Sequence, residues 1–390
     1  MSRHPRSGSG HPRLHPQAQP SLQTTDETFM RRALALAERG RGLTSPNPMV
    51  GAVVVRDGEV VGEGFHARAG APHAEVEALR AAGPRAQGAT LYVTLEPCNH
   101  HGRTPPCAPV VRGAGVRRVV AALSDPNPFV AGGGADSLRA AGVAVDTGIL
   151  AGEAAAQNRV FLTAMREQRP HVTLKAGMTA DGKIADVHGG ARWITGEAAR
   201  GEAHRQRSET DAIVVGVTTV LRDDPALTVR LETPWPREPY RVVLDSAART
   251  PPGSRVVTGA TASRALIAVG DAAPPRRVAD LEAAGAVVLR CPARDGRVAV
   301  DAVLAALFAR DVRAVLLEGG GEVHAAFLDA GVVDRVALFV APLLLGGREA
   351  PGVVGGAGRE LKSAVRLGPM SARLVGPDLL IEADVAREPR

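Results

Sequence analysis

Three side chains that bind soft metal ions, those of His73, Cys98 and Cys107, constrain the fold of this chain more than any other feature of its sequence. Zinc takes His nitrogen and Cys sulfur in a tetrahedral arrangement, and a catalytic zinc site keeps its fourth position open for water. One ion must reach all three side chains. The segments that carry them are therefore predicted to meet in the fold.

Glu75 lies two residues after His73, where it is predicted to shuttle protons and not to bind the metal. His-x-Glu followed by Pro-Cys is typical of zinc deaminases that remove an amino group from a pyrimidine-type ring. In nucleic-acid deaminases two residues usually separate the two cysteines. Here eight residues, 99–106, lie between Cys98 and Cys107, and they are free to line a pocket.

Other interpretations of these residues stay open at this point. The site can be a structural zinc knuckle, or the cysteines can simply fill a core, as free cysteines often do. A structural site normally needs a fourth protein ligand, and none stands at a natural spacing. His100 and His101 are conceivable extra ligands, although we interpret them as pocket residues. Ligand types alone also allow iron in place of zinc.

The length of 390 residues predicts two or three domains, and the composition, 45% apolar and 23% charged, is that of an ordinary soluble protein. Three cysteines argue against a disulfide framework and for a reducing, cytoplasmic compartment, with Cys291 as a bystander. The chain has no apolar run long enough for a membrane span, and no secretory signal is apparent.

The net charge of +6 does not indicate a nucleic-acid partner. Half of this excess lies in residues 1–25, which contain three arginines and no acids and are predicted to form a disordered tail. The chain has only 2 Trp, 2 Tyr and 7 Phe, too few for platforms on which bases stack. Lysines are rare, so the pair Lys175 and Lys183 stands out, although chance placement explains it equally well.

Two α/β units follow the tail, one over 26–170 and one over 171–390. In the first we predict helices at 30–38, 73–82, 107–113 and 135–141, a hairpin of strands 51–55 and 59–63, and strands at 89–95 and 116–123. In the second we predict a helix at 197–207, strands at 171–176, 211–215, 241–244, 265–269, 286–289, 314–317 and 336–340, and a terminal hairpin of 371–375 and 378–383.

A glycine cluster, Glu318-Gly319-Gly320-Gly321, follows a predicted strand and opens a helix. Glycines let the backbone approach a phosphate, and the helix N-terminus favours an anion. Glycine clusters also make ordinary turns, so the pattern alone is a weak signal. It is not a first-strand Gly-x-Gly-x-x-Gly, which disfavours a standard dinucleotide fold.

Several blocks of the chain resemble the bifunctional riboflavin-biosynthesis deaminase/reductase family over residues 28–385. Segments 44–51, 94–107 and 125–128 resemble the deaminase half, and segments 175–183, 193–195, 211–216, 223–230, 241–246 and 318–321 resemble the reductase half. The resemblance implies a cytidine-deaminase-like zinc domain followed by a dihydrofolate-reductase-like, NADPH-dependent domain. It further implies deamination of 2,5-diamino-6-hydroxy-4-(5-phosphoribosylamino)pyrimidine, then reduction of the ribosyl group to ribityl, in a homodimer or higher homo-oligomer.

The resemblance also implies individual roles. It assigns zinc to His73, Cys98 and Cys107 and proton transfer to Glu75. The implied cofactor contacts are Gly177, Trp193, Thr219, Asp223, Ser246, Gly320, Gly321, Glu322, Val323, His324, Ala325 and Ala326. The implied substrate contacts are Arg207, Leu227, Arg230 and Glu318, the two arginines as clamps for a ribose phosphate.

The chain departs from the family pattern at two places. Thr179-Ala180 replaces Ser-Leu, which keeps a hydroxyl, and Ala191 replaces a serine, which removes one possible substrate hydrogen bond.

Two other functions remain alternatives to the bifunctional deaminase/reductase. The first is a monofunctional zinc deaminase of a nucleoside or nucleic-acid base with a non-catalytic second domain, and the second is an interaction protein that has lost its chemistry.

Overall fold

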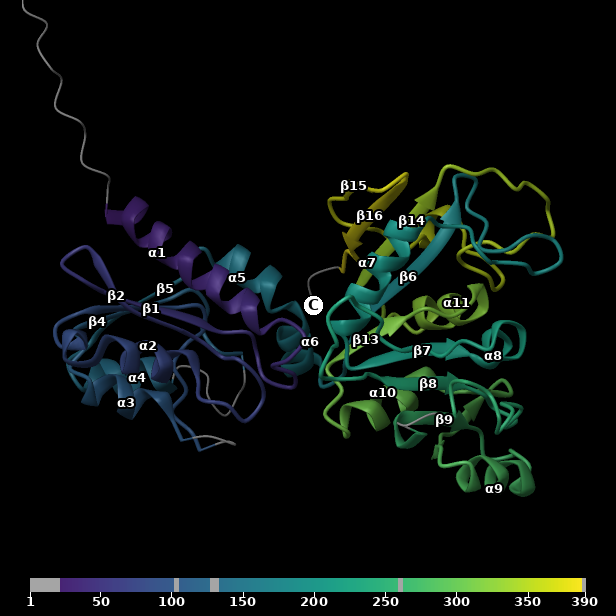
Figure 1. Ribbon diagram of the computed structural model, residues 1–390, viewed down its shortest axis with the longest axis horizontal. Coiled ribbons are helices and arrows are strands. Elements are labelled where there is room, and N and C mark those ends of the chain that lie inside the picture. Colours follow the sequence, from purple (N-terminus) through teal and green to yellow (C-terminus); the bar gives the residue numbers. More distant parts are fainter. Residues whose placement is uncertain (1–21, 102–104, 127–132, 259–261, 388–390) are drawn as a thin grey trace, which may run out of the picture.

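The computed structural model describes residues 22–101, 105–126, 133–258 and 262–387. Most of the tail predicted over 1–25, and part of the block 125–128, lie outside these ranges. The described chain forms two α/β units side by side, each built on its own sheet, with α6 (Arg159–Glu167) between them (Figure 1). No helix in the described ranges has the length and apolar character that crossing a membrane requires.

The first unit has a five-stranded sheet of order β2-β1-β3-β4-β5. Its strands are β1 (Gly51–Arg56), β2 (Glu59–Phe65), β3 (Thr90–Val93), β4 (Arg118–Ala121) and β5 (Ala144–Thr147). The predicted hairpin of β1 and β2 is confirmed, and Asp57 and Gly58 both take positive φ, as a tight two-residue turn requires. Strands β3, β4 and β5 are parallel.

Helices cover both faces of this sheet because successive side chains of its strands point to opposite sides. Val53 and Val55 pack with α1 (Leu22–Ala37) and α5 (Ala151–Gln157), whereas Ala52 and Val54 pack with the opposite layer. That layer contains α2 (Ala74–Ala82), α3 (Cys107–Gly113) and α4 (Gly133–Ala140), with the short helices η1 (Glu38–Gly40) and η2 (Gly83–Ala86) at the ends of α1 and α2. Helix α1 begins at Leu22, eight residues before the predicted helix start at residue 30, so residues 22–25, predicted as part of the disordered tail, are helical.

Strand β2 fixes the position of α2 through a close approach. A side chain on Gly64 would place its Cβ 2.5 Å from the carbonyl oxygen of Ala74, so only glycine fits there. Helix α2 therefore lies directly on the strand. Its first turn follows His73, the N-cap residue, and contains Glu75.

The second unit has a nine-stranded sheet of order β10-β9-β8-β7-β13-β6-β14-β16-β15. Its strands are β6 (His171–Thr179), β7 (Ala212–Gly216), β8 (Tyr240–Leu244), β9 (Ala265–Val269), β10 (Val287–Arg290), β13 (Ala314–Leu317), β14 (Arg335–Ala341), β15 (Ser371–Val375) and β16 (Asp378–Asp384). In this sheet order, the seven strands from β10 through β14 run parallel. The predicted terminal hairpin β15–β16 adds an antiparallel edge.

Both faces of this sheet are covered, as in other parallel sheets. Val214 and Val242 pack in one cluster with α10 (Val300–Phe308) and α11 (Gly321–Asp329). Ile213 and Val243 pack in another with α8 (Val217–Asp223) and α9 (Pro275–Ala283). The remaining elements are α7 (Glu197–Ser208), the short helices η3 (Ala262–Arg264) and η4 (Leu361–Ser363), and the small pair β11 (Ala293–Arg294) and β12 (Arg297–Val298).

Candidate active sites

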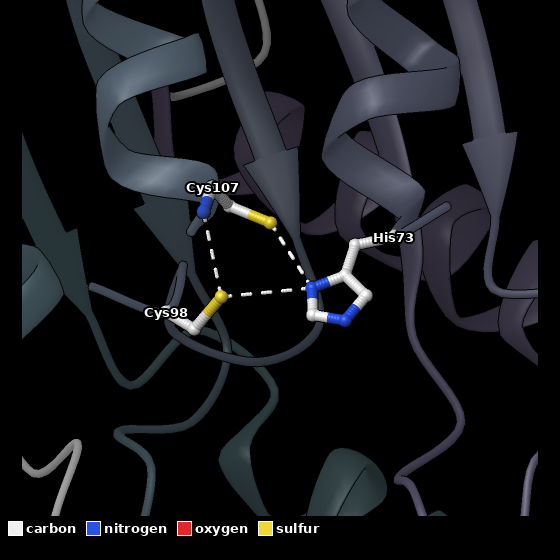
Figure 2. A group of neighbouring side chains, drawn as sticks. All are labelled: His73, Cys98 and Cys107. Atoms are coloured by element: carbon white, nitrogen blue, oxygen red, sulfur yellow. Dashed lines mark hydrogen bonds between the residues drawn. The ribbon is translucent and has the colours of Figure 1, made fainter. Parts of the chain in front are cut away.

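The three predicted metal ligands come together in the first unit. The donor atoms of His73, Cys98 and Cys107 all lie within 4.8 Å of one another, and Figure 2 shows the three side chains turned toward a common point. His73 Nδ1 lies 3.1 Å from Cys107 Sγ and 3.6 Å from Cys98 Sγ. One imidazole and two thiols are a donor set that zinc prefers, so the residues fit the implied metal.

Two helix starts and one loop position these donors. His73 precedes α2, and Cys107 is the first residue of α3, as the sequence predicts. The loop that carries Cys98 folds back onto α3, because the Cys98 carbonyl accepts the N–H groups of Cys107 and Ala108 at 3.0 Å each. The Cys107 N–H also points at Cys98 Sγ. Hydrogen bonding by Cys107 and His73 lowers the pKa of the Cys98 thiol to about 4, which favours the thiolate that binds metal.

Glu75 lies beside this cluster and is buried. Burial raises the pKa of its carboxyl to about 7, although the charge of His73 and a hydrogen bond with Cys107 oppose the shift. A cation held by the neighbouring donors would lower this pKa again. Glu75 is therefore placed to exchange protons next to the metal site without being part of the donor group.

His100 and His101 do not join the donor group found among the described residues. His101 is exposed, and His100 is only partly buried. Their interpretation as extra ligands thus gains no support from the arrangement.

Two residues near the metal site carried no predicted role. The ring of His66 meets that of His73 edge-on, with centroids 5.4 Å apart. Asn47 Nδ2 lies 3.1 Å from His66 Nε2, and His66 Nδ1 lies 3.0 Å from the carbonyl oxygen of Pro72. The carbonyl requires a donor at Nδ1, which leaves Nε2 to accept from Asn47. His66 thereby ties the loop of Asn47 to the start of α2.

The second unit brings together three charged side chains that are far apart in sequence. Arg207 donates to both oxygens of Glu318 at 2.7 Å, and Lys175 Nζ lies 3.8 Å from the same carboxylate. Burial alone would raise the pKa of Glu318, but the charges of Arg207 and Lys175 lower it to about 2. Lys175, which carried no predicted site role, thus lies beside the predicted substrate residues Arg207 and Glu318.

The other predicted substrate residues surround this cluster. Leu227 is buried and takes a positive φ of 49°. Arg207 also donates to the Thr228 carbonyl oxygen at 3.1 Å, and the N–H of Arg230 points at His204 Nδ1. Within the described residues the Arg230 guanidinium has no acidic partner, and burial together with the charges of Arg207 and Arg255 lowers its pKa.

Most predicted cofactor residues lie where parallel strands end, the usual place for a ligand in an open α/β sheet. Gly320 follows β13 with φ +66°, and a Cβ there would lie 3.8 Å from Thr219 Oγ1 in α8. Ser246 follows β8 and accepts the Val298 N–H at 2.9 Å. The segment from Gly321 to Ala326 forms the first two turns of α11, although His324 is turned inward and bonds the Val353 carbonyl oxygen at 2.8 Å.

The remaining cofactor residues lie on the segments around β6. Gly177 is in β6, where a Cβ would lie 3.1 Å from Thr195 Cγ2. Trp193 is 67% exposed and is covered on one face by Arg200, 4.7 Å from the ring centroid. Asp223 ends α8, and its carbonyl oxygen accepts a hydrogen bond from Arg192.

Asp181 has a structural role, as expected for a residue at a turn. Hydrogen bonds from the Thr179 hydroxyl and from the N–H groups of Gly346 and Leu345 lower its pKa to about 2. It is therefore an ionised anchor for the segment at 345–346 and not an acid. Thr179 keeps the hydroxyl on which this anchor depends.

Both units match families of known proteins. Residues 23–123 match the cytidine and deoxycytidylate deaminase zinc-binding region, and residues 170–381 match the RibD C-terminal domain. The riboflavin biosynthesis protein RibD of Actinobacillus pleuropneumoniae is 44% identical over 360 residues, 92% of this chain and 95% of the relative. The RibD of Escherichia coli is 42% identical over 370 residues, 91% and 98% of the two chains.

Solved structures agree with these matches. Acinetobacter baumannii RibD superposes with a TM-score of 0.85 at 37% identity, over 94% of this chain and all of that one. A diaminohydroxyphosphoribosylaminopyrimidine deaminase/5-amino-6-(5-phosphoribosylamino)uracil reductase from Thermotoga maritima gives a TM-score of 0.79 at 36% identity, over 93% and 99%. The similarity spans both units and nearly the whole length of the relatives, so this chain belongs to the RibD family of bifunctional deaminase/reductases of riboflavin biosynthesis.

Proposed function

We propose that this chain deaminates 2,5-diamino-6-hydroxy-4-(5-phosphoribosylamino)pyrimidine by hydrolysis and then reduces its ribosyl group to ribityl with NADPH. The observation that carries the proposal is the convergence of His73, Cys98 and Cys107 beside the buried Glu75. A lone nucleoside deaminase with an inert second domain is not favoured, because the relatives match both domains. A protein without chemistry is disfavoured because all four of these side chains are present.

In the deaminase domain His73, Cys98 and Cys107 would hold the zinc. Bound zinc activates water at neutral pH. Glu75 would take up one proton of the attacking water and deliver it to the ring nitrogen. It would then take the remaining proton of the added hydroxyl and deliver it to the leaving amine, which departs as ammonia. Its place two residues after a metal ligand, at the start of a helix fixed against β2, keeps the carboxyl in reach of that exchange.

In the reductase domain the charged cluster would bind the ribosyl phosphate end of the substrate. Both donating edges of Arg207 are occupied by Glu318 and Thr228, so we assign Arg207 the task of holding Glu318 in place. The Arg230 guanidinium has no acidic partner in the described chain, which suits a phosphate. Glu318 and Lys175 would then orient the ribosyl group for reduction.

The cofactor would lie along the carboxyl ends of β7, β8 and β13. NADPH supplies the hydride, and the protein supplies orientation and shielding. At Gly319 a Cβ would lie 2.5 Å from Val215 Cα, so the backbone comes close to its neighbours without side chains in between. The first N–H groups of α11, which follow at Gly321, are suited to a phosphate of the cofactor.

We also propose the boundaries 26–170 for the deaminase domain and 171–390 for the reductase domain, a homodimer as the assembly and the cytoplasm as the compartment. Met370 and Leu374, immediately before and within the edge strand β15, are 69% and 75% exposed, which supports an interface there. The three cysteines are all free thiols, which suits a reducing compartment. A light-scattering mass of a single chain would contradict the dimer.

A time course on the purified protein tests the two activities. The diaminopyrimidine substrate is supplied with and without NADPH, while ammonia and the absorbance of reduced nicotinamide are followed. Ammonia in both arms, with cofactor oxidation only where NADPH is present, is expected. Ammonia without any oxidation would leave a lone deaminase, and no ammonia from a zinc-replete sample would refute the substrate assignment.

A further inference from the structure

One hydrogen bond joins the deaminase loop at 44–48 to the reductase domain. Ser45 Oγ donates to Asp211 Oδ2 at 2.8 Å, across 166 residues of sequence. Asp211 directly precedes β7, whereas Ser45 belongs to the loop that leads to Asn47. The bond therefore connects the sheet of one domain with a loop next to the metal site of the other.

Asp211 is a rigid anchor. Its Oδ2 also accepts the N–H groups of Arg313 and Ala314 at 2.8 Å each, and its Oδ1 accepts from Arg237 at 2.6 Å. The carboxylate is 6% exposed. Since partners within the reductase domain occupy both of its oxygens, that domain sets its position, and the Ser45 hydroxyl must come to it.

A short series of contacts leads from Ser45 to the ligand His73. The Asn47 N–H bonds the Thr44 carbonyl oxygen at 2.8 Å, which closes a turn around Ser45. The side chain of Asn47 then reaches His66 at 3.1 Å, and the His66 ring lies edge-on against His73. A second contact of His66, 3.0 Å to the Pro72 carbonyl oxygen, holds the residue before the ligand.

The loop at 44–48 borders an open space on its reductase side, although the preceding Gly42 lies so close to the reductase domain that a Cβ there would be 2.7 Å from the Ser208 carbonyl oxygen. A cavity of about 790 Å³ lies between the domains and is lined by Ser45 and Asn47 on one side and by Thr210 and Arg313 on the other. The far end of the loop is held within the deaminase domain, because the side chain of Asn158 bonds the N–H and carbonyl oxygen of Met49 at 2.8 and 2.9 Å. At the near end, the Ser45 side chain carries a hydrogen bond to the reductase domain.

We propose that Ser45 and Asp211 are positioning residues through which the reductase domain completes the deaminase site. With Ser45 bonded to Asp211, the turn at 44–47 presents Asn47 to His66, and His66 holds the ring of His73 in the orientation that the donor group needs. Loss of a partner bonded directly to a metal ligand changes metal affinity or activity by about 10- to 100-fold. Ser45 acts on His73 through Asn47 and His66, so its loss should have an effect at the lower end of that range. The inference rests on the proposed deaminase function.

The test compares Ser45→Ala with wild type in the full-length, zinc-loaded protein. We expect the deaminase kcat to fall about tenfold and zinc to pass to a chelator about tenfold faster. The reductase kcat on the already deaminated substrate, measured in the same sample, should stay within about twofold of wild type. Ser45→Thr keeps the hydroxyl and should restore both deaminase readouts, while Ser363→Ala, which removes an exposed local bond, should change neither.

Two results in Ser45→Ala would contradict the proposal. Unchanged deaminase kcat and zinc release in Ser45→Ala would overturn the proposal, as would an equal loss of both activities, which indicates general destabilisation. Adding Ser45→Ala to Asp211→Asn should cause no further loss if the two residues act as a unit, and an additive loss would contradict this. If the wild type itself releases no ammonia, the proposed function fails first.

Discussion

The two candidate sites are built on different principles. In the deaminase domain three donors from two helix starts and one loop converge within 4.8 Å, and each is specified by the chemistry of its own side chain. In the reductase domain the residues proposed to contact the cofactor are spread over five segments, and we expect them to act largely through backbone, beside one charged cluster at Glu318. A metal site can therefore be recognised from a few residues, whereas a nucleotide site emerges only when several strands are placed side by side.

The largest expected effect is at Glu75. Replacing it by Gln keeps the size of the side chain but removes the base, so ammonia release should fall by about 10²- to 10⁴-fold. Zinc content and NADPH oxidation on the deaminated substrate should stay at wild-type levels. Glu77→Gln, on the same helix but in an exposed pair with Arg80, is the matched control. Persistent deamination in Glu75→Gln would refute the proton-shuttle role.

The next largest expected effect is at Glu318, in the charged cluster of the reductase domain. Glu318→Gln leaves Arg207 and Lys175 without their counter-charge, and breaking a buried ion pair from one side costs about 3–5 kcal/mol. We expect reductase turnover to fall by about 100-fold and the melting temperature to drop, while ammonia release persists. Glu360→Gln breaks only an exposed pair with Lys362, worth less than about 1 kcal/mol. Wild-type reduction by Glu318→Gln would show that the cluster is only structural.

The same contrast, between local signals and contacts made across the chain, separates what the sequence alone predicted from what it did not. Apart from β5, the strands of both main sheets were predicted, as were the two ligand-bearing helices, because their apolar runs and caps are local signals. Strand β5, with exposed side chains at three of its four positions, has no such signal, and α5 and α6 also went unpredicted. The roles of Lys175 and Ser45 depend on partners distant in sequence, Ser45 and Asp211 being 166 residues apart, which no local pattern encodes. The role of His66 depends on the folding of the Asn47 loop onto it.

A smaller effect concerns His171, which begins β6 at the junction of the domains. Burial, together with the charges of Arg159 and Arg169, lowers its pKa from 6.5 to about 4, although Asp334 opposes this. Above pH 6.5 the imidazole is neutral in both states, so it has no effect on stability there. Below pH 6.5 the unfolded chain takes up a proton that the native chain does not, and stability falls by about 3 kcal/mol by pH 4.

Urea unfolding between pH 7.5 and 4.5 measures this contribution. His171→Gln should flatten the decline with pH, whereas the exposed control His188→Gln should keep the wild-type slope. An unchanged slope in His171→Gln would assign the acid sensitivity to other groups. Because the reductase domain contains β6, its unfolding transition should carry the effect more than that of the deaminase domain.

The central claim is that one domain depends on a metal and the other does not. It is tested most directly by removing zinc from the intact protein with a chelator and measuring both half-reactions before removal, after removal and after zinc is restored. We predict that ammonia release disappears and returns with zinc, while reduction of the already deaminated substrate continues throughout. Loss of both reactions, or of neither, would contradict it.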